Sequence, residues 1–159
     1  MKNYIAAALP ALALAACSGG SEALQPGQWE MTLTVTEASA EGMPEGEEAG
    51  MIAELNRELA MDPSCVSEEQ AASPTYNIFV PREAASECDF SGSTVENGVI
   101  QIAGACGDGP DEGGELTLTG TYSATSMEGV MTAQIQDGRR AFSFNATMTG
   151  ERTGECSGK

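Results

Sequence analysis

The chain contains no histidine, and this absence removes the commonest forms of enzyme chemistry. There is no imidazole to act as a general base, to activate a serine or cysteine nucleophile, or to bind zinc. Lysine is almost absent too, since only Lys2 and Lys159 are present. A catalytic site would have to rely on carboxylates or tyrosine, so we expect a protein that is not an enzyme and that needs no cofactor or metal.

Positive charge of any kind is scarce. Seven Lys and Arg residues stand against 24 Asp and Glu residues, and the formal net charge is −17. Binding to nucleic acid depends on basic side chains that neutralise phosphate, so we expect no nucleic-acid partner. An anionic membrane surface would also repel the domain, so contact with a bilayer would have to come through a lipid.

The apolar segment at the N-terminus is too short to span a bilayer as a helix, which takes about 20 residues. It runs from Tyr4 to Leu14, after Lys2 and before two small alanines. A positive residue, an apolar stretch and small residues, in this order, are typical of a secretory signal peptide. We therefore expect residues 1–16 to be a signal peptide.

The segment ends in Leu14-Ala15-Ala16-Cys17, which resembles the lipobox of bacterial lipoproteins. In that family the cysteine receives a diacylglyceryl group, the peptide is cut before it, and the new N-terminus is acylated. The resemblance implies a lipid on Cys17, followed by a tether over residues 17–23. The length that remains suits one domain, over residues 24–159. The alternative is an ordinary signal peptide followed by a chance cysteine.

The residue after the cysteine bears on the destination. In well-studied Gram-negative bacteria an Asp at this position retains a lipoprotein at the inner membrane, so Ser18 favours the outer membrane. We expect a lipid-anchored protein on the periplasmic side of the cell envelope, in contact with the membrane through its N-terminal lipid.

Five cysteines are present, and the lipobox reserves Cys17 for the lipid. In an oxidising compartment the other four imply two disulfides, because their spacings match no metal or redox motif. These four are Cys65, Cys88, Cys106 and Cys156.

A predicted hairpin suggests how the cysteines pair, because Asn97-Gly98 is a strong turn signal between Cys88 and Cys106. A three-residue loop, Glu96 to Gly98, places the two cysteines opposite each other, whereas a two-residue turn opposes Cys88 to Gly107. We favour the first register and hence a Cys88–Cys106 disulfide. By elimination, the second disulfide joins Cys65 and Cys156.

The first part of the domain predicts a strand, a loop and then a helix. Strict alternation from Trp29 to Thr36 predicts a half-buried strand, with Trp29 as a core anchor. Residues 37–50 are mostly Glu, Ala, Ser, Gly and Pro, and predict a mobile acidic loop. Apolar residues then recur at helical spacing from Met51 to Leu59, before a stop at Asp62-Pro63.

The middle of the domain carries weaker signals. Ser67 and Gln70 have the spacing of a capping box, which predicts a single helical turn through Ala72. Residues 73–87 are interrupted by prolines and predict irregular structure. Within them, Tyr76 to Val80 is expected to form a brief strand or to cover the core.

The last third predicts a meander whose inward faces hold Leu, Met and Phe. A two-residue turn at Asp137-Gly138 pairs Ala133 with Phe142 and Met131 with Phe144. We interpret the methionines as core residues rather than soft copper ligands. The fold class is therefore α+β and rich in β, with a curved antiparallel meander of about six strands and one amphipathic helix packed on it.

Carboxylates suggest two further sites, each weak because acidic residues are so common. Residues 107–115 offer hard oxygens for calcium, but they lack the EF-hand pattern and are better explained as a solvated turn. A carboxylate-based hydrolase would need a pair such as Asp89 with Asp108, or Glu30 near Tyr122. The candidate calcium ligands in residues 107–115 are Asp108, Asp111, Glu112 and Glu115.

Three short motifs fit together along the domain, with Gly120-Thr121-Tyr122-Ser123 between the second and third. They are Gln25-Pro26-Gly27-Gln28-Trp29-Glu30, Cys65-Val66-Ser67-Glu68-Glu69 and Gly150-Glu151-Arg152-Thr153-Gly154-Glu155-Cys156. Together they resemble a family of bacterial envelope proteins defined by domain of unknown function 3617, from about Leu24 to Cys156. The resemblance implies export, paired cysteines and a β-rich domain. It brings no activity, substrate or catalytic residue.

We therefore expect a non-enzymatic envelope lipoprotein that acts as a binding or structural module. A carrier that holds a hydrophobic ligand on the concave face of its sheet is the first alternative. A deep pocket of several hundred Å³ would favour the carrier, whereas a face plugged by its own side chains would exclude it. The hydrolase is the remaining alternative. The identity of a protein or ligand partner stays open.

Overall fold

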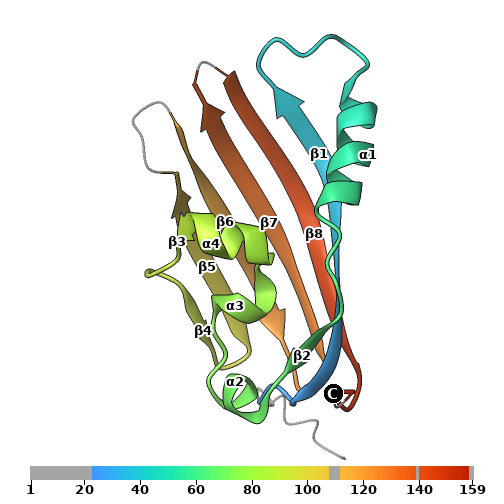
Figure 1. Ribbon diagram of the computed structural model, residues 1–159, viewed down its shortest axis with the longest axis vertical. Coiled ribbons are helices and arrows are strands. Elements are labelled where there is room, and N and C mark those ends of the chain that lie inside the picture. Colours follow the sequence, from blue (N-terminus) through green and yellow to red (C-terminus); the bar gives the residue numbers. More distant parts are fainter. Residues whose placement is uncertain (1–22, 108–111, 139, 158–159) are drawn as a thin grey trace, which may run out of the picture.

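The fold is an antiparallel sheet curled into a half-barrel, with short helices inside the curve (Figure 1). It is known from a computed structural model that describes residues 23–107, 112–138 and 140–157. The strands lie in the order β2-β1-β8-β7-β6-β5-β3, and β4 also pairs with β5, at the other end of β5 from β3. Their bounds are β1 (Gly27–Ala40), β2 (Ser64–Val66), β3 (Cys88–Asp89), β4 (Thr94–Glu96), β5 (Val99–Cys106), β6 (Glu112–Tyr122), β7 (Ser126–Asp137) and β8 (Arg140–Gly154). The predicted signal peptide, Cys17 and Ser18 lie outside the described residues.

Helices α1 (Glu48–Glu58), α2 (Glu68–Ala72), α3 (Tyr76–Phe79) and α4 (Arg82–Glu87) complete the described part of the chain. The β-rich curved sheet is as predicted, but the prediction of about six strands and one helix is not exact, because the described residues form eight strands and four helices. Residues 73–87 contain two short helices instead of a strand, and they bury Ile78, Phe79 and Val80. They therefore cover the core, which was the second of the two roles expected for residues 76–80.

Strand β1 is longer than its alternation predicts. Residues 37–40 were expected in a loop, but they pair with β8, where Ala38 lies opposite Phe144. A register shift between Val35 and Glu37 returns Ala38 to the buried face, and this shift hides the strand from a search for strict alternation. The long β8 supplies the hydrogen-bonding partner that makes the extension stable.

The core lies on the concave face, as the inward positions predict. Trp29 is fully buried, and its Nε1 donates a hydrogen bond to the carbonyl oxygen of Gln25 at 3.0 Å. Met131 and Met148 are also buried, which agrees with their interpretation as core residues. The predicted pairing of β7 with β8 is wrong by two residues, because Ala133 lies opposite Phe144 and Met131 opposite Ala146. A shift of two residues leaves every side chain on its predicted face.

The predicted disulfide in the hairpin is present, but the turn and the register differ from the prediction. The turn holds only Asn97 and Gly98, both at positive φ (52° and 77°), so the predicted three-residue loop is wrong. Residues 90–93 separate β3 from β4 and absorb a shift of one residue, so Cys88 still lies opposite Cys106. Both predicted disulfides are present, Cys88–Cys106 and Cys65–Cys156.

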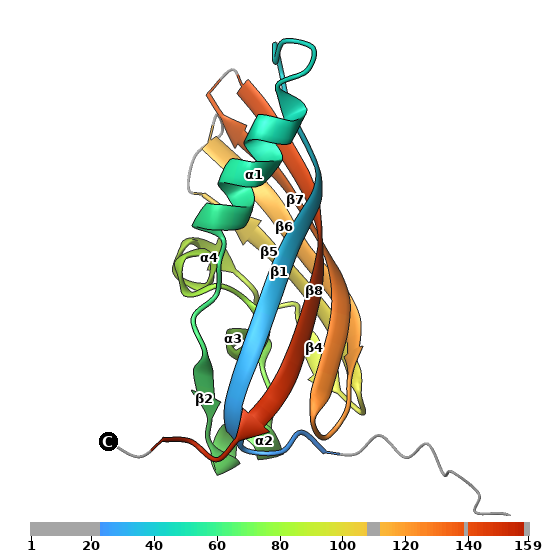
Figure 2. The same cartoon turned by 90° about the vertical axis from the view of Figure 1, so that its right-hand side faces the viewer.

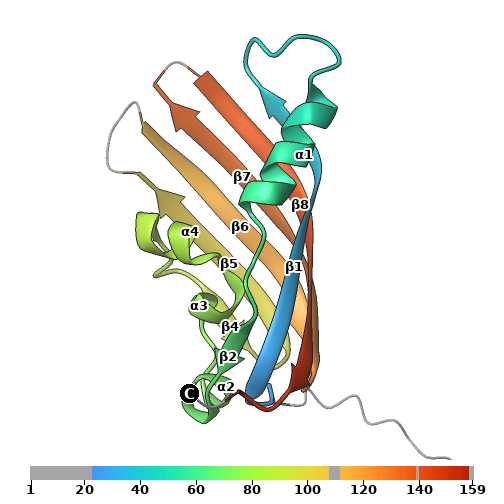
Figure 3. The same cartoon turned by 45° about the vertical axis from the view of Figure 1, so that its right-hand side comes forward.

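The helices lie on the concave side of the sheet, with α1 along β1 and with α3 and α4 over the opposite part (Figures 2 and 3). No residue of α1 is fully buried, although Ile52, Leu55 and Leu59 pack against the core. Helix α2 has the predicted capping box, in which Ser67 accepts from the Gln70 amide and Gln70 accepts from the Ser67 amide.

Candidate functional site

A cavity of about 430 Å³ lies between the concave face of the sheet and the helices. Residues from four strands form its floor, and the segment after α1 together with α3 and α4 forms its roof. We call it the concave pocket. Its lining residues are Leu33, Glu58, Leu59, Ala60, Met61, Asp62, Pro63, Ser64, Asn77, Ile78, Val80, Pro81, Arg82, Ala84, Leu116, Met131 and Phe144.

The floor of the concave pocket is apolar and rigidly placed. Leu33, Leu116, Met131 and Phe144 lie on β1, β6, β7 and β8, and each is at most 8% exposed. Alternation along each strand points all four side chains to the same face of the sheet. The floor is therefore set by the pleat of the sheet, with no contribution from loops.

The roof is mostly apolar but less deeply buried, and Ser64 and Asn77 add polar groups to it. Leu59, Met61 and Ala84 are partly buried, whereas Ile78 and Val80 are buried. These residues lie in the link from α1 to β2 and in the segment that forms α3 and α4. No strand or helix in either segment is longer than six residues. A roof of short elements is easier to displace than a continuous sheet, because each element has few contacts of its own.

Charged side chains stand at the edge of the concave pocket. Glu58 ends α1, Asp62 lies in the link to β2, and Arg82 begins α4. All three are exposed to solvent. Arg82 also lines a neighbouring hollow of about 400 Å³ beside β2, so it stands where the two hollows meet.

A larger hollow, of about 820 Å³, lies where β1, β7 and β8 pass the far end of the sheet. It is wider open than the concave pocket, and polar residues such as Ser39, Gln134 and Asn145 line much of it. Ligand pockets are typically enclosed and mainly apolar, with a few polar groups at fixed positions. The concave pocket fits this description better, despite its smaller volume.

The carboxylate pairs proposed from the sequence are not brought together. Glu30 is exposed on β1, whereas Tyr122 lies on β6, and β8 and β7 stand between these strands. Asp89 accepts a hydrogen bond from the amide of Ser91 at 2.9 Å, and its proposed partner Asp108 lies outside the described residues. The described part of the chain contains no fully buried charged side chain and so offers no enclosed catalytic carboxylate.

The acidic loop proposed for calcium is only partly described. Asp108 and Asp111 fall outside the described residues, while Glu112 and Glu115 belong to β6. Within the described ranges, no group of three or more Asp, Glu, Cys or His side chains is placed to hold a metal ion.

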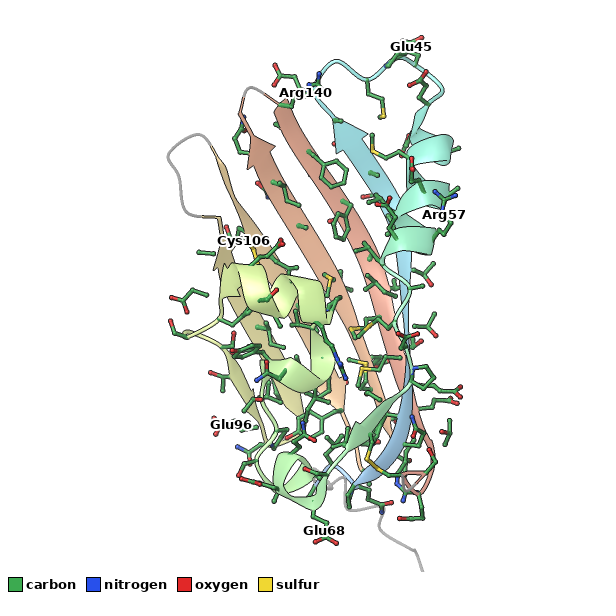
Figure 4. The ribbon with its side chains drawn as sticks, in the orientation of Figure 1. Glu45, Arg57, Glu68, Glu96, Cys106 and Arg140 are labelled. Carbon is green, nitrogen blue, oxygen red and sulfur yellow. A yellow bond between two sulfur atoms is a disulfide. The ribbon has the colours of Figure 1, made fainter. Side chains whose placement is uncertain are left out.

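None of the four cysteines lines the concave pocket, although Cys65 lines the neighbouring hollow beside β2. One disulfide joins β2 to the segment after β8, and the other joins β3 to β5 near the edge of the sheet, where Figure 4 labels Cys106. Their positions indicate that they hold segments together.

The pocket floor was predicted as a buried face, and residues 76–80 were expected as one possible cover of the core, but no pattern placed Met61 or showed that a cavity lies beneath this cover. Met61 follows the end of the helical spacing, and Ile78 and Val80 have no clear periodicity, so their place in the roof of a cavity was not predicted. The available signal was a set of large apolar residues in a segment broken by prolines, which a soluble loop would rarely contain.

None of the helices in the described ranges is both long enough and apolar enough to cross a membrane.

Comparison with known proteins places the chain in a family. A family model described as "Protein of unknown function (DUF3617)" matches residues 24–156, which is most of the chain. No curated protein matches the chain, and no solved structure does. The chain therefore belongs to the DUF3617 family of proteins of unknown function.

Proposed function

We propose that this protein is a non-enzymatic binding module of the bacterial cell envelope, and that it carries a hydrophobic ligand in the concave pocket. The observation that carries the proposal is the pocket itself, about 430 Å³ in volume with an apolar floor and a mostly apolar roof. Pockets for small ligands span roughly 300–1,000 Å³ and are mostly apolar. A face plugged by its own side chains would have favoured a purely structural module.

The proposed location rests on the N-terminus and on the disulfides. A lipid on Cys17 would hold the domain on the periplasmic side of the envelope, at the outer membrane if Ser18 acts as it does in Gram-negative lipoproteins. Two disulfides are in keeping with an oxidising compartment. Leu24 is only 4% exposed, so the tether between lipid and domain would end at residue 23.

A substitution that fills the pocket tests the proposed carrier. Ala84 is partly buried and lines the concave pocket, so Ala84→Phe would place a ring in the ligand's volume. We expect the variant to bind the neutral fluorescent probe N-phenyl-1-naphthylamine at least tenfold more weakly than the native protein. Fluorescence titration measures the affinity, and thermal unfolding monitored by circular dichroism checks that the variant folds.

Two further variants complete this test. Ala60→Trp changes an exposed residue at the edge of the same pocket, so it should block the probe without disturbing the core. Ala53→Phe adds the same ring as Ala84→Phe at an exposed position of α1 that does not line the pocket, and it should leave binding unchanged. If the native protein fails to bind the probe, or if both pocket variants bind it normally, the carrier proposal is wrong.

Lipid attachment has its own test. Cys17→Ser removes the acceptor sulfur, so the protein should move from the membrane fraction to the soluble periplasmic fraction. Retention in the membrane fraction would contradict the proposed anchor. Ser18→Asp keeps the cysteine and should instead move the protein from the outer to the inner membrane on a density gradient.

A further inference from the structure

The edge of the concave pocket carries charges of both signs, and they come from different elements. Arg82 lies at the start of α4, whereas Glu58 and Asp62 lie at the end of α1 and in the link that follows. The charged edge therefore joins the two halves of the roof, with the positive group on one half and the two negative groups on the other.

Arg82 and Arg140 have no ion pair among the described side chains, and of the two only Arg82 lines the concave pocket. Arg57 pairs with Glu54 at 3.3 Å, and Arg152 pairs with Glu155 while also donating to the carbonyl oxygen of Pro26 at 2.7 Å. Among the described side chains, no carboxylate lies within ion-pair distance of Arg82. An unpaired guanidinium beside an apolar cavity is available to an anionic group on a ligand.

The two carboxylates restrict which ligand fits. A head group with only negative charge would be attracted by Arg82 but repelled by Glu58 and Asp62. A head group with only positive charge would meet the opposite conflict. A head group with one charge of each sign can satisfy both halves of the edge.

The volume of the concave pocket limits the apolar part. A methylene group occupies about as much space as a water molecule in the liquid, roughly 30 Å³. The cavity of about 430 Å³ therefore suits a single chain of about 14 carbons. This volume favours one chain over two.

We propose that the ligand class of the concave pocket is a zwitterionic amphiphile with a single acyl chain. The chain lies on the floor between the strands and the short helices. The anionic group of the head lies beside Arg82, and the cationic group lies beside Glu58 and Asp62. This inference rests on the proposed carrier function, since it identifies the ligand of the same pocket.

Four amphiphiles with the same 14-carbon chain test the inference by isothermal titration calorimetry, each below its critical micelle concentration. They are a zwitterionic lysophosphatidylcholine, a neutral monoacylglycerol, tetradecanoate and tetradecyltrimethylammonium. Ion pairs at an exposed edge are weak and are screened by salt, so the titrations use about 20 mM salt. We expect the zwitterion to bind about two- to fivefold more tightly than the neutral amphiphile, and more tightly than either singly charged one.

Variants that remove charge test whether the preference for the zwitterion comes from Arg82, Glu58 and Asp62. Arg82→Gln should weaken the zwitterion two- to fivefold and improve binding of the cationic amphiphile. The double variant Glu58→Gln/Asp62→Asn should improve binding of tetradecanoate instead. Arg140→Gln and Glu45→Gln change the net charge in the same directions at the far end of the molecule (Figure 4), and they should leave the preference unchanged.

The outcomes separate this inference from the carrier proposal. If all four amphiphiles bind with equal affinity, or if tetradecanoate binds most tightly, the zwitterion inference is overturned and the carrier proposal stands. An Arg140→Gln effect as large as that of Arg82→Gln would also overturn the inference, because the preference would then come from net charge. If none of the four binds, both proposals fail.

Discussion

At the scale of a single residue, Gly104 gives the most direct test of the packing. A Cβ built on Gly104 would overlap the ring of Phe90, which stacks on Tyr76 of α3 with ring centroids 4.9 Å apart. Gly104→Ala should therefore displace the ring and lower the free energy of unfolding by about 1–3 kcal/mol. Urea denaturation followed by circular dichroism measures this change.

Gly92→Ala is the matched control for this substitution. A Cβ on Gly92 would meet no atom within 4 Å, so the change in unfolding free energy should stay within about 0.5 kcal/mol. Equal effects at the two glycines would show that the Phe90 contact does not limit the size of residue 104.

At the scale of an element, one polar side chain adds hydrogen bonds to the apolar contacts that hold α1 to the sheet. The Asn56 side chain accepts a hydrogen bond from the amide of Val35 at 2.8 Å and donates one to its carbonyl oxygen at 3.3 Å. The Asn56 side chain thus pairs with backbone groups at the edge of β1 that have no neighbouring strand, since β2 pairs with only three residues of β1. Because no residue of α1 is fully buried, these two hydrogen bonds are a large part of what fixes the helix.

Asn56→Ala should release α1 without unfolding the sheet. We expect hydrogen exchange to accelerate along α1 and at the Val35 amide, while the amides of β6 and β7 keep their protection. The loss of both hydrogen bonds should cost about 1–3 kcal/mol of unfolding free energy. Hydrogen exchange resolved by mass spectrometry or NMR measures the first effect, and urea denaturation measures the second.

Arg57→Ala is the control on the same helix. The Arg57–Glu54 pair is exposed, with side chains 75% and 62% accessible, so its loss should change little. If Asn56→Ala leaves the exchange of α1 as slow as Arg57→Ala does, apolar packing alone holds the helix.

At the scale of the whole molecule, the two disulfides close loops of very different length. Cys65 and Cys156 are 91 residues apart in sequence, whereas Cys88 and Cys106 are 18 apart. In the chain-entropy model the longer link stabilises by about 4–5 kcal/mol and the shorter by about 3 kcal/mol. Replacing Cys65 and Cys156 by alanine should therefore lower the unfolding free energy more than replacing Cys88 and Cys106. Denaturation of the two double variants under non-reducing conditions checks the order, and a reversed order would contradict the entropic explanation.

Much of the architecture follows from local chemistry along the chain. Alternation assigns Trp29, Met131 and Phe144 to the buried face, and the capping box predicts α2. The Cys88–Cys106 pairing is predictable in outline, because both cysteines flank a hairpin with a strong turn signal, but their direct opposition depends on the one-residue shift over residues 90–93. The assignments to the buried face survive errors of register, since a shift of two residues in β7 and β8 keeps each side chain on the same face.

The concave pocket and its roof depend on contacts between distant parts of the chain. The extension of β1 to Ala40 requires the long partner strand β8, and the position of α1 requires Asn56 to reach the edge of β1 at Val35. Met61, Ile78 and Val80 become a roof only because the curved sheet offers them an apolar surface. The sequence alone therefore establishes which strand residues face inward, because this depends on neighbours along the chain. It pairs Cys65 with Cys156 only by elimination, since these two are 91 residues apart. The register, the helical cover and the pocket arise in the tertiary structure, because they depend on pairing and packing between residues far apart in sequence.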